Sequence, residues 1–231
     1  MSVLEVTGLA KSFGGLKAVD DVSFHLDAGE MLAVIGPNGA GKTTCFNMIG
    51  GQLGADAGRI MFAGIDISRL PARKIWRLGV GRTFQITATA PSMTVRENVQ
   101  LALLSHHGRT GHMWRPAASL YLAEADELLA RTGMADQAGR AAGVLAYGDL
   151  KRLELEIALA HAPKLFLLDE PTAGMAPGER SDLMQLIADI GADRNISVLF
   201  TEHDMDAVFA HADRIVVLNR GQVLAEGSVD E

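Results

Sequence analysis

Apolar and polar residues alternate along the first thirty positions, as half-buried β-strands require. The apolar members of this pattern are Val3, Val6, Val22, Phe24 and Leu26. Two glycine-containing pairs at 14–15 and 28–29 interrupt it and predict turns. A short apolar strand at 31–35 then runs into a glycine-rich loop, followed by a helix that begins near Lys42 and ends at Gly50-Gly51.

The pattern changes twice further along the chain. A strand is expected around 59–62, and a polar turn at 64–68 follows it. From about 95 to 159 the spacing is helical, most clearly at 124–129 and 150–159, while the aperiodic stretch 105–116 predicts an exposed loop. Strands are expected again at 164–168, 197–200 and 214–218, with a helix at 178–190. The order predicts a βα core, a helical insertion and a return to the core.

Composition narrows the classes of function. Hydrophobic residues make up 48% of the 231 residues, which is ordinary for a globular protein. The chain has 21 basic and 28 acidic residues, a net charge of −7, and its basic residues are scattered, which argues against nucleic acid as a partner. No apolar run approaches the roughly 18 residues of a membrane-spanning helix, and no secretory signal pattern is visible at the N-terminus. A cytoplasmic protein is therefore expected.

The loop after the strand at 31–35 fits the phosphate-binding pattern G-x-x-x-x-G-K-[ST] at every fixed position. Its glycines let successive backbone N–H groups turn inward around an anion, and the helix that follows presents its positive end. Lys42 is predicted to bridge the β- and γ-phosphates of a nucleotide, and the Thr43 hydroxyl to bind Mg²⁺. The predicted nucleotide-binding residues of this loop are Gly36, Pro37, Asn38, Gly39, Ala40, Gly41, Lys42, Thr43 and Thr44.

Two carboxylates, Asp169 and Glu170, end the strand expected at 164–168. Open α/β sheets bind ligands at the carboxyl ends of their strands, so Asp169 is predicted to hold Mg²⁺ and Glu170 to polarise the attacking water. His203 follows the next apolar strand and is predicted to contact the γ-phosphate. A solvated acidic turn is the competing interpretation, and the phosphate loop on the same chain disfavours it.

At this point the residues resemble the ATP-binding cassette (ABC) family, over essentially the whole chain. Gln85 in GRTFQ resembles the glutamine that links Mg²⁺ to the transport subunit, and Phe13 is similar to the aromatic residue that stacks on adenine; an ordinary core phenylalanine is the alternative. The resemblance implies a P-loop NTPase of the ABC type, with a RecA-like α/β core, an antiparallel β subdomain and an inserted α-helical subdomain. It implies one nucleotide-binding domain over 1–231, with the core at about 1–85 and 163–231 and the helical subdomain at about 86–162.

The run LAYGDLKR at 145–152 looks like the signature LSGGQ, which binds the γ-phosphate of a partner subunit's ATP. Its predicted contact residues are Ala146, Tyr147, Gly148 and Asp149. LAYG, together with GGLKAVDDVSF, GRTFQ, MTVRENV and TEHDM, resembles the branch that takes up branched-chain (hydrophobic) amino acids. Asp149 departs from the expected glutamine, and a carboxylate near a phosphate is repulsive unless it is screened or points away.

The resemblance implies an ATPase, with ATP and Mg²⁺, that powers an importer. Its expected partners are membrane permease subunits and a second cassette, as heterodimer or homodimer, with a periplasmic solute-binding protein acting indirectly. It is expected to lie peripherally on the inner face of the cell membrane. Three alternatives stay open: uptake of another solute such as urea or an aromatic acid, a non-transport ABC ATPase, and a module that binds ATP without hydrolysing it.

Overall fold

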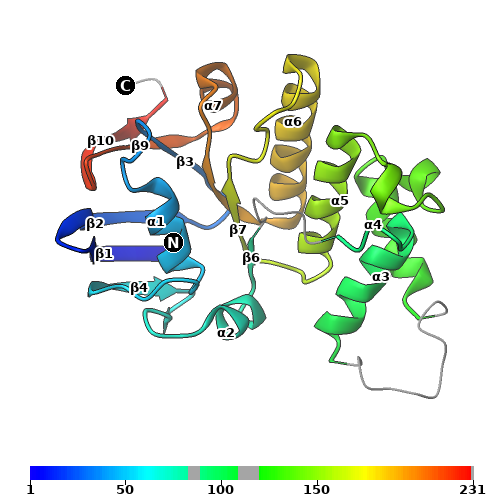
Figure 1. Cartoon of the computed structure of the whole chain (residues 1–231), viewed down its shortest axis with the longest axis horizontal. Coiled ribbons are helices and arrows are strands. Elements are labelled where there is room, and N and C mark those ends of the chain that lie inside the picture. Colours follow the sequence, from blue (N-terminus) through cyan, green and yellow to red (C-terminus); the bar gives the residue numbers. More distant parts are fainter. Residues whose placement is uncertain (83–88, 109–119, 230–231) are drawn as a thin grey trace.

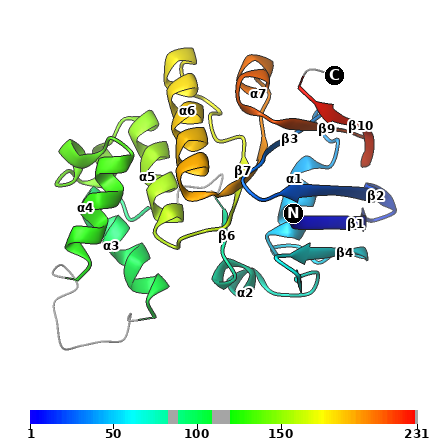
Figure 2. The same ribbon diagram turned by 180° about the vertical axis from the view of Figure 1, so that it is seen from behind.

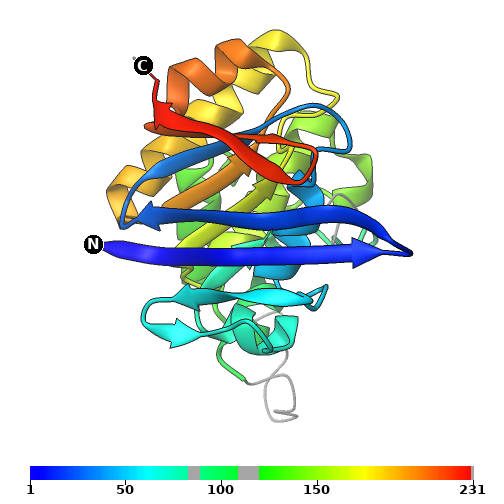
Figure 3. The same cartoon turned by 90° about the vertical axis from the view of Figure 1, so that its left-hand side faces the viewer.

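The computed structural model describes residues 1–82, 89–108 and 120–229, and within them the strands form two sheets (Figure 1). The first is antiparallel with the order β2-β1-β4-β5. Its strands are β1 (Ser2–Phe13), β2 (Leu16–Asp27), β4 (Ala57–Phe62) and β5 (Ile65–Asp66). Figure 3 shows its long strands β1 and β2, in dark blue, crossing in front of the rest of the molecule.

The second sheet has the order β10-β9-β3-β8-β7-β6, and all its neighbours are parallel except the edge pair β10 and β9. Its strands are β3 (Met31–Ile35), β6 (Val80–Arg82), β7 (Leu165–Asp169), β8 (Ser197–Thr201), β9 (Arg214–Asn219) and β10 (Gln222–Ser228). The strands β3, β7 and β8 are buried almost throughout, as parallel strands covered on both faces should be.

The helices divide between two hydrophobic cores. Helix α1 (Lys42–Ile49) packs its buried face, which includes Phe46 and Ile49, into the core between the two sheets. Helices α5 (Tyr147–Leu159), α6 (Pro177–Arg194) and α7 (Met205–His211) contribute to a second core with the other face of the parallel sheet. Helices α3 (Val95–His106) and α4 (Leu122–Arg131) extend that core, and Figures 1 and 2 show them with α5 on the side away from β1 and β2. Helix α2 (Ala72–Arg77) lies between β5 and β6 along the chain.

The predicted α/β fold with an antiparallel sheet and an inserted helical group is confirmed, and several local predictions are wrong. Ser105 and His106, predicted to lie in an exposed loop, are the last residues of α3, because a helix can continue past its last buried residue. Residues 109–116 of that predicted loop lie outside the described residues. The polar turn at 64–68 contains the two-residue strand β5. The elements α2, β6, α7 and β10 were not predicted, since they are short or mostly exposed.

Candidate nucleotide site

The phosphate loop connects the carboxyl end of β3 to the first turn of α1, and its glycines are required by both conformation and space. Gly36 has a φ of 147°, and a Cβ there would lie 2.1 Å from the Leu218 carbonyl oxygen. Gly41 has a φ of 104°, and a Cβ there would lie 2.5 Å from the Ala18 carbonyl oxygen. The loop thus fits tightly against β9 and β2, and only glycine allows this close approach.

Lys42 is the first residue of α1 and is buried. Its ammonium donates hydrogen bonds to the Gly36 carbonyl at 2.6 Å and to the Pro37 carbonyl at 3.3 Å, so the positive charge lies inside the curve of the loop. The first turn of α1 carries no acidic residue that would offset the positive end of the helix. The loop therefore offers an anion both a fixed cation and free N–H dipoles.

Asp169 and Glu170 lie at the carboxyl end of β7, where the neighbouring strand β8 holds both of them. The Thr201 hydroxyl donates to Asp169 Oδ1 at 2.9 Å. The Glu170 backbone N–H bonds the Thr201 carbonyl at 3.1 Å and the Thr201 hydroxyl oxygen at 3.0 Å. Glu170 has a φ of 52°, in the left-handed region, which turns its side chain away from the strand direction. One residue of β8, Thr201, thus bonds the carboxylate of Asp169 and the backbone of Glu170.

His203 contacts Glu170 directly. Its Nε2 lies 2.8 Å from Glu170 Oε1, and both side chains are partly exposed. The residue before it, Glu202, is buried and accepts hydrogen bonds from the Thr172 backbone N–H at 2.9 Å and the Thr172 hydroxyl at 2.7 Å. These bonds tie the segment after β7 to the segment after β8. The buried Glu202–Thr172 bonds thus fix the two segments that carry Glu170 and His203.

A cavity of about 660 Å³ brings most of the predicted nucleotide residues together. Its lining residues are Phe13, Leu16, Lys17, Ala18, Asn38, Gly39, Ala40, Gly41, Lys42, Thr43, Thr44, Glu170 and Arg220. Phe13 is 49% exposed, so it is not a core residue, and the Lys11 ammonium lies 5.7 Å from its ring centre. A cavity lined by both an exposed aromatic ring and the phosphate loop suits a nucleotide.

Two predicted Mg²⁺ ligands suit a hard cation. Thr43 offers a hydroxyl at the start of α1, and Asp169 offers a carboxylate oxygen. A catalytic Mg²⁺ usually takes only one or two protein oxygens and completes its shell with water and phosphate. The described ranges contain no group of three or more histidine, cysteine or acidic residues fit to bind a metal. The third predicted ligand, Gln85, lies outside the described residues.

The predicted signature residues lie at the start of α5, and none of them lines the cavity. Ala146 is the residue before the helix and provides no side-chain cap, and Asp149 lies in the first turn. The Tyr147 hydroxyl donates to the Ala173 carbonyl at 2.9 Å, and Gly148 is buried. The structure therefore brings Phe13, the loop and Glu170 to one cavity and leaves Ala146–Asp149 apart from it.

Several residues at the site were missed by the sequence analysis. Thr201 and Arg82 hold Asp169, and Leu16, Lys17 and Arg220 line the cavity. Four of them lie inside runs that were used to identify the family branch, namely Thr201 in TEHDM, Arg82 in GRTFQ, and Leu16 and Lys17 in GGLKAVDDVSF. They reach the site because the sheets place β2, β6 and β8 beside it, and Arg220 reaches it from the turn between β9 and β10.

Comparison with known proteins gives a consistent result. A family model described as ABC transporter matches residues 19–173. The high-affinity branched-chain amino acid transport ATP-binding protein BraF of Pseudomonas aeruginosa is 40% identical over 99% of this chain and 92% of its own length. The corresponding LivG protein of Salmonella typhimurium is 41% identical with the same coverage, and a probable LivG of Methanocaldococcus jannaschii is 34% identical over 100% of this chain and 91% of its own length.

Solved structures agree with the sequence relatives. The ADP conformation of an ATP-binding cassette of an ABC transporter superposes with a TM-score of 0.88 at 33% identity, covering 99% of this chain and 91% of that one. A nucleotide-free cassette from an ABC transporter gives a TM-score of 0.87 at 33% identity, with 99% and 92% coverage. Within the described residues no helix has the length and apolar character needed to cross a lipid bilayer.

Proposed function

Because the chain belongs to the ABC transporter family, we propose that it is the ATP-hydrolysing subunit of an importer for branched-chain amino acids. The relatives that are 40 to 41% identical over nearly the whole chain are branched-chain amino acid transport ATP-binding proteins. Among the uptake substrates considered for this cassette, their names favour branched-chain amino acids over urea or an aromatic acid.

The placement of Glu170 is the observation that supports ATP hydrolysis by this chain. Its carboxylate shares one cavity with Lys42 and Thr43 and lies 2.8 Å from His203. A carboxylate opposite the phosphate loop can orient a water toward the γ-phosphorus and accept its proton as the bond to ADP breaks. This arrangement supports turnover rather than passive binding of ATP.

The remaining residues receive roles by position. Lys42 neutralises the β- and γ-phosphates, the backbone N–H groups of 36 and 38–44 hold their oxygens, and Phe13 stacks on the adenine. Thr43, Asp169 and Gln85 hold Mg²⁺, which supplies charge neutralisation at the phosphates. His203 contacts the γ-phosphate and keeps Glu170 oriented.

The site is completed by a second cassette. Since Ala146–Asp149 lie outside the cavity of their own chain, they are free to contact ATP bound to a partner's loop, and the partner's signature would close this one. The segment Gln85–Thr94, where the helical subdomain of about 86–162 begins, is expected to contact the membrane permease. A heterodimer of cassettes in the assembled importer, peripheral on the inner face of the membrane and served by a periplasmic solute-binding protein, completes the proposal.

Glu170→Gln tests the proposal. The amide keeps the size of the side chain but cannot accept the proton, so phosphate release should fall by roughly 10²-fold or more, while ATP binding is retained. Gel filtration with ATP should then show an accumulated dimer. Glu5→Gln, at an exposed position of β1, is the matched control and should hydrolyse ATP at the parental rate. Parental turnover by the Glu170→Gln protein would refute the assignment.

A further inference from the structure

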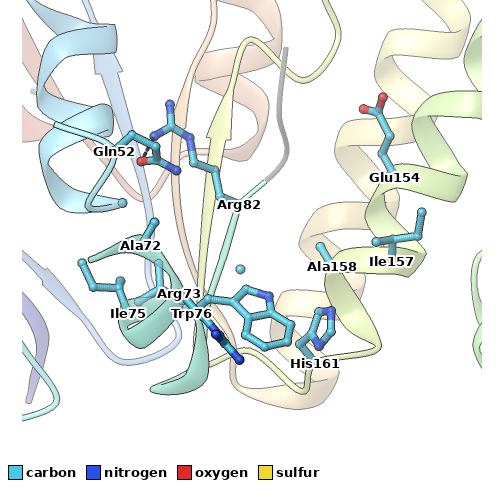
Figure 4. Close-up of a pocket in the computed structure, with 13 residues that line it drawn as sticks. Gln52, Ala72, Arg73, Ile75, Trp76, Arg82, Glu154, Ile157, Ala158 and His161 are labelled. Carbon is cyan, nitrogen blue, oxygen red and sulfur yellow. Dashed lines mark hydrogen bonds between the residues drawn. The ribbon is translucent and has the colours of Figure 1, made fainter. Parts of the chain in front are cut away.

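Arg82, the last residue of β6, extends its guanidinium to the carboxyl end of α1. Nη1 donates to the Phe46 carbonyl at 3.0 Å and to Gln52 Oε1 at 2.7 Å, and Nη2 donates to Asn47 Oδ1 at 2.8 Å. Figure 4 shows the side chain rising from β6 toward Gln52. The Phe46 carbonyl also accepts from the Gly50 backbone N–H at 2.9 Å, so the guanidinium adds a second bond to it. A cation at this end of a helix opposes the negative end of the helix dipole. Arg82 thereby holds the far end of the helix whose first turn carries Lys42 and Thr43.

Gly50 provides the space for this contact. A Cβ at Gly50 would lie 3.0 Å from Arg82 Nη1 and 2.4 Å from Gln52 Oε1. Its φ of −78° is open to any residue, so glycine is needed here for room and not for conformation. The end of α1 is therefore shaped around the Arg82–Gln52 pair.

The same guanidinium reaches the acidic end of β7. Nη2 lies 3.8 Å from Asp169 Oδ2, and the side chains of Arg82 and Asp169 are only 11% and 3% exposed. Thr201 holds the other oxygen, Oδ1. The Asp169 carboxylate is thus oriented from two sides, by a hydroxyl from β8 and by a cation from β6. A buried charge pair of this kind depends on its geometry, because the loss of one partner leaves the other without compensation.

Arg82 also forms part of the wall of a second cavity, of about 330 Å³, between α2 and α5 (Figure 4). Ile75 and Trp76 line one side and Ile157 the other. One side chain therefore contacts this cavity, the end of α1 and the candidate Mg²⁺ ligand. No other described arginine or lysine bonds α1 and Asp169 together.

We propose that Arg82 is a positioning residue for ATP hydrolysis, which fixes the Asp169 carboxylate and the carboxyl end of α1 so that Asp169 and Thr43 meet the same Mg²⁺. The inference rests on the proposed ATPase function and adds a residue to it. Two effects on Mg²⁺ binding oppose each other here. Removal of a nearby positive charge favours the cation by Coulomb's law, whereas loss of orientation of a ligand that binds the metal weakens it.

The test compares Arg82→Met, which keeps the length of the side chain, with Arg82→Lys and with the control Arg59→Met. Arg59 is exposed, and within the described residues its ion-pair partner is Asp66 in the antiparallel sheet. The first measurement is the Mg²⁺ concentration that gives half-maximal ATP hydrolysis. The second is binding of Mn²⁺ in the presence of ADP, followed by electron paramagnetic resonance. The third is ADP binding in EDTA, which reports on a folded phosphate loop.

Arg82→Met should raise the half-maximal Mg²⁺ concentration and the dissociation constant of Mn²⁺ by about 10-fold or more, with ADP binding in EDTA retained. Arg82→Lys should recover part of the loss, since its ammonium can reach some of the same partners. Unchanged or tighter metal binding in Arg82→Met would overturn the inference. A purely structural role would lower nucleotide binding in EDTA and metal binding together, and that result would overturn it too.

Where Arg82→Met does not fold, Gly50→Ala crowds the Arg82–Gln52 pair without a change of charge and should shift the Mg²⁺ dependence in the same direction. An unchanged Mg²⁺ dependence in a folded Gly50→Ala protein would count against the inference. Absence of ATP hydrolysis in the parental chain and in Arg59→Met alike would refute the proposed function instead, so the two failures are distinguishable.

Discussion

At the scale of single residues, Glu156 is a buried carboxyl whose pKa is strongly raised. It is fully buried on α5, where the Thr132 hydroxyl donates to its Oε1, and Oε2 has no hydrogen-bond partner among the described residues. Burial raises the pKa of this carboxyl from 4.5 to about 7, against the opposing effects of Thr132 and Arg152. The neutral form is therefore favoured in the folded protein.

This shift predicts how stability depends on pH. Between about pH 4.5 and 7 the folded chain keeps a proton at Glu156 that the unfolded chain has released, so the free energy of unfolding falls as pH rises through this window. Glu156→Gln, which imitates the neutral form, should remove the fall and stabilise the protein at pH 8 by on the order of 2 kcal/mol. Urea unfolding at pH 5 and pH 8 measures this. Equal pH dependence in the variant and the parent would contradict it, and Glu5→Gln is the exposed control.

The site residues that could be predicted from the sequence are those that a motif places at fixed intervals along the chain. Gly36, Lys42, Asp169 and Glu170 could be found because a loop or a strand end presents each of them in a set order along the chain. Arg82 and Thr201 could not be found this way, because their partners lie on other strands. Only the sheet order β8-β7-β6 places them beside Asp169.

At the scale of elements, the helix α5 begins with an unusual first turn. Ala146 provides no side-chain cap, and Asp149 is the acidic residue of that turn. An acid there stabilises the helix through its dipole by about 0.3–1 kcal/mol. In the proposed dimer the same carboxylate faces a partner's γ-phosphate, where its charge is repulsive. We therefore expect Asp149 to stabilise the helix while it weakens the assembled site.

Asp149→Asn should lower the stability of the folded chain and strengthen its ATP-dependent dimerisation. The free energy of unfolding should fall by a few tenths of a kcal/mol up to about 1, while the ATP-dependent dimer becomes tighter. Sedimentation of the Glu170→Gln chain, with and without Asp149→Asn, measures the dimer, and thermal unfolding measures the helix. Asp182→Asn, on the exposed face of α6, should change neither. Weaker dimerisation on loss of the Asp149 charge would refute this account.

The elements themselves were predictable in proportion to their length and burial. The bounds of α1 follow from the loop before it and the glycines after it. The start of α3 carries a capping box, in which Thr94 and Glu97 bond each other's backbone N–H groups, and the run TVRE was a signal that could have located it. The strand β10 is exposed along most of its length, so no alternation of buried residues marks it.

At the scale of the whole molecule, the two halves of the proposed catalytic unit lie in different places. The phosphate loop opens into the cavity beside Phe13, between β3 and α1, whereas the signature begins α5 outside that cavity. In a head-to-tail pair, each phosphate loop faces the signature of the other chain, which makes two complete sites. In a single chain the loop and the signature do not face each other. We therefore expect the pair to be the unit of hydrolysis.

Mixing two inactive variants tests this arrangement. Lys42→Ala abolishes the loop of its own chain, and Gly148→Asp places a side chain at the buried first turn of the signature helix. Each protein alone should be inactive, whereas their mixed dimer contains one site with an intact loop and an intact signature. With random pairing, phosphate release should recover to roughly a quarter of the parental rate. A mixture as inactive as either variant, despite measured dimerisation, would contradict the shared site.

The burial of Cys45 makes the chain a convenient object for labelling. It is the only cysteine in the sequence, and it faces the core from α1, where burial raises the pKa of its thiol to about 12. The reactive thiolate is therefore scarce at neutral pH and shielded from solvent. A pair of cysteines introduced at exposed positions of α2 and α4 can carry fluorophores in an otherwise native protein. The distance between the catalytic core and the helical insertion can thus be followed through a cycle of ATP turnover without alteration of the core beneath the phosphate loop.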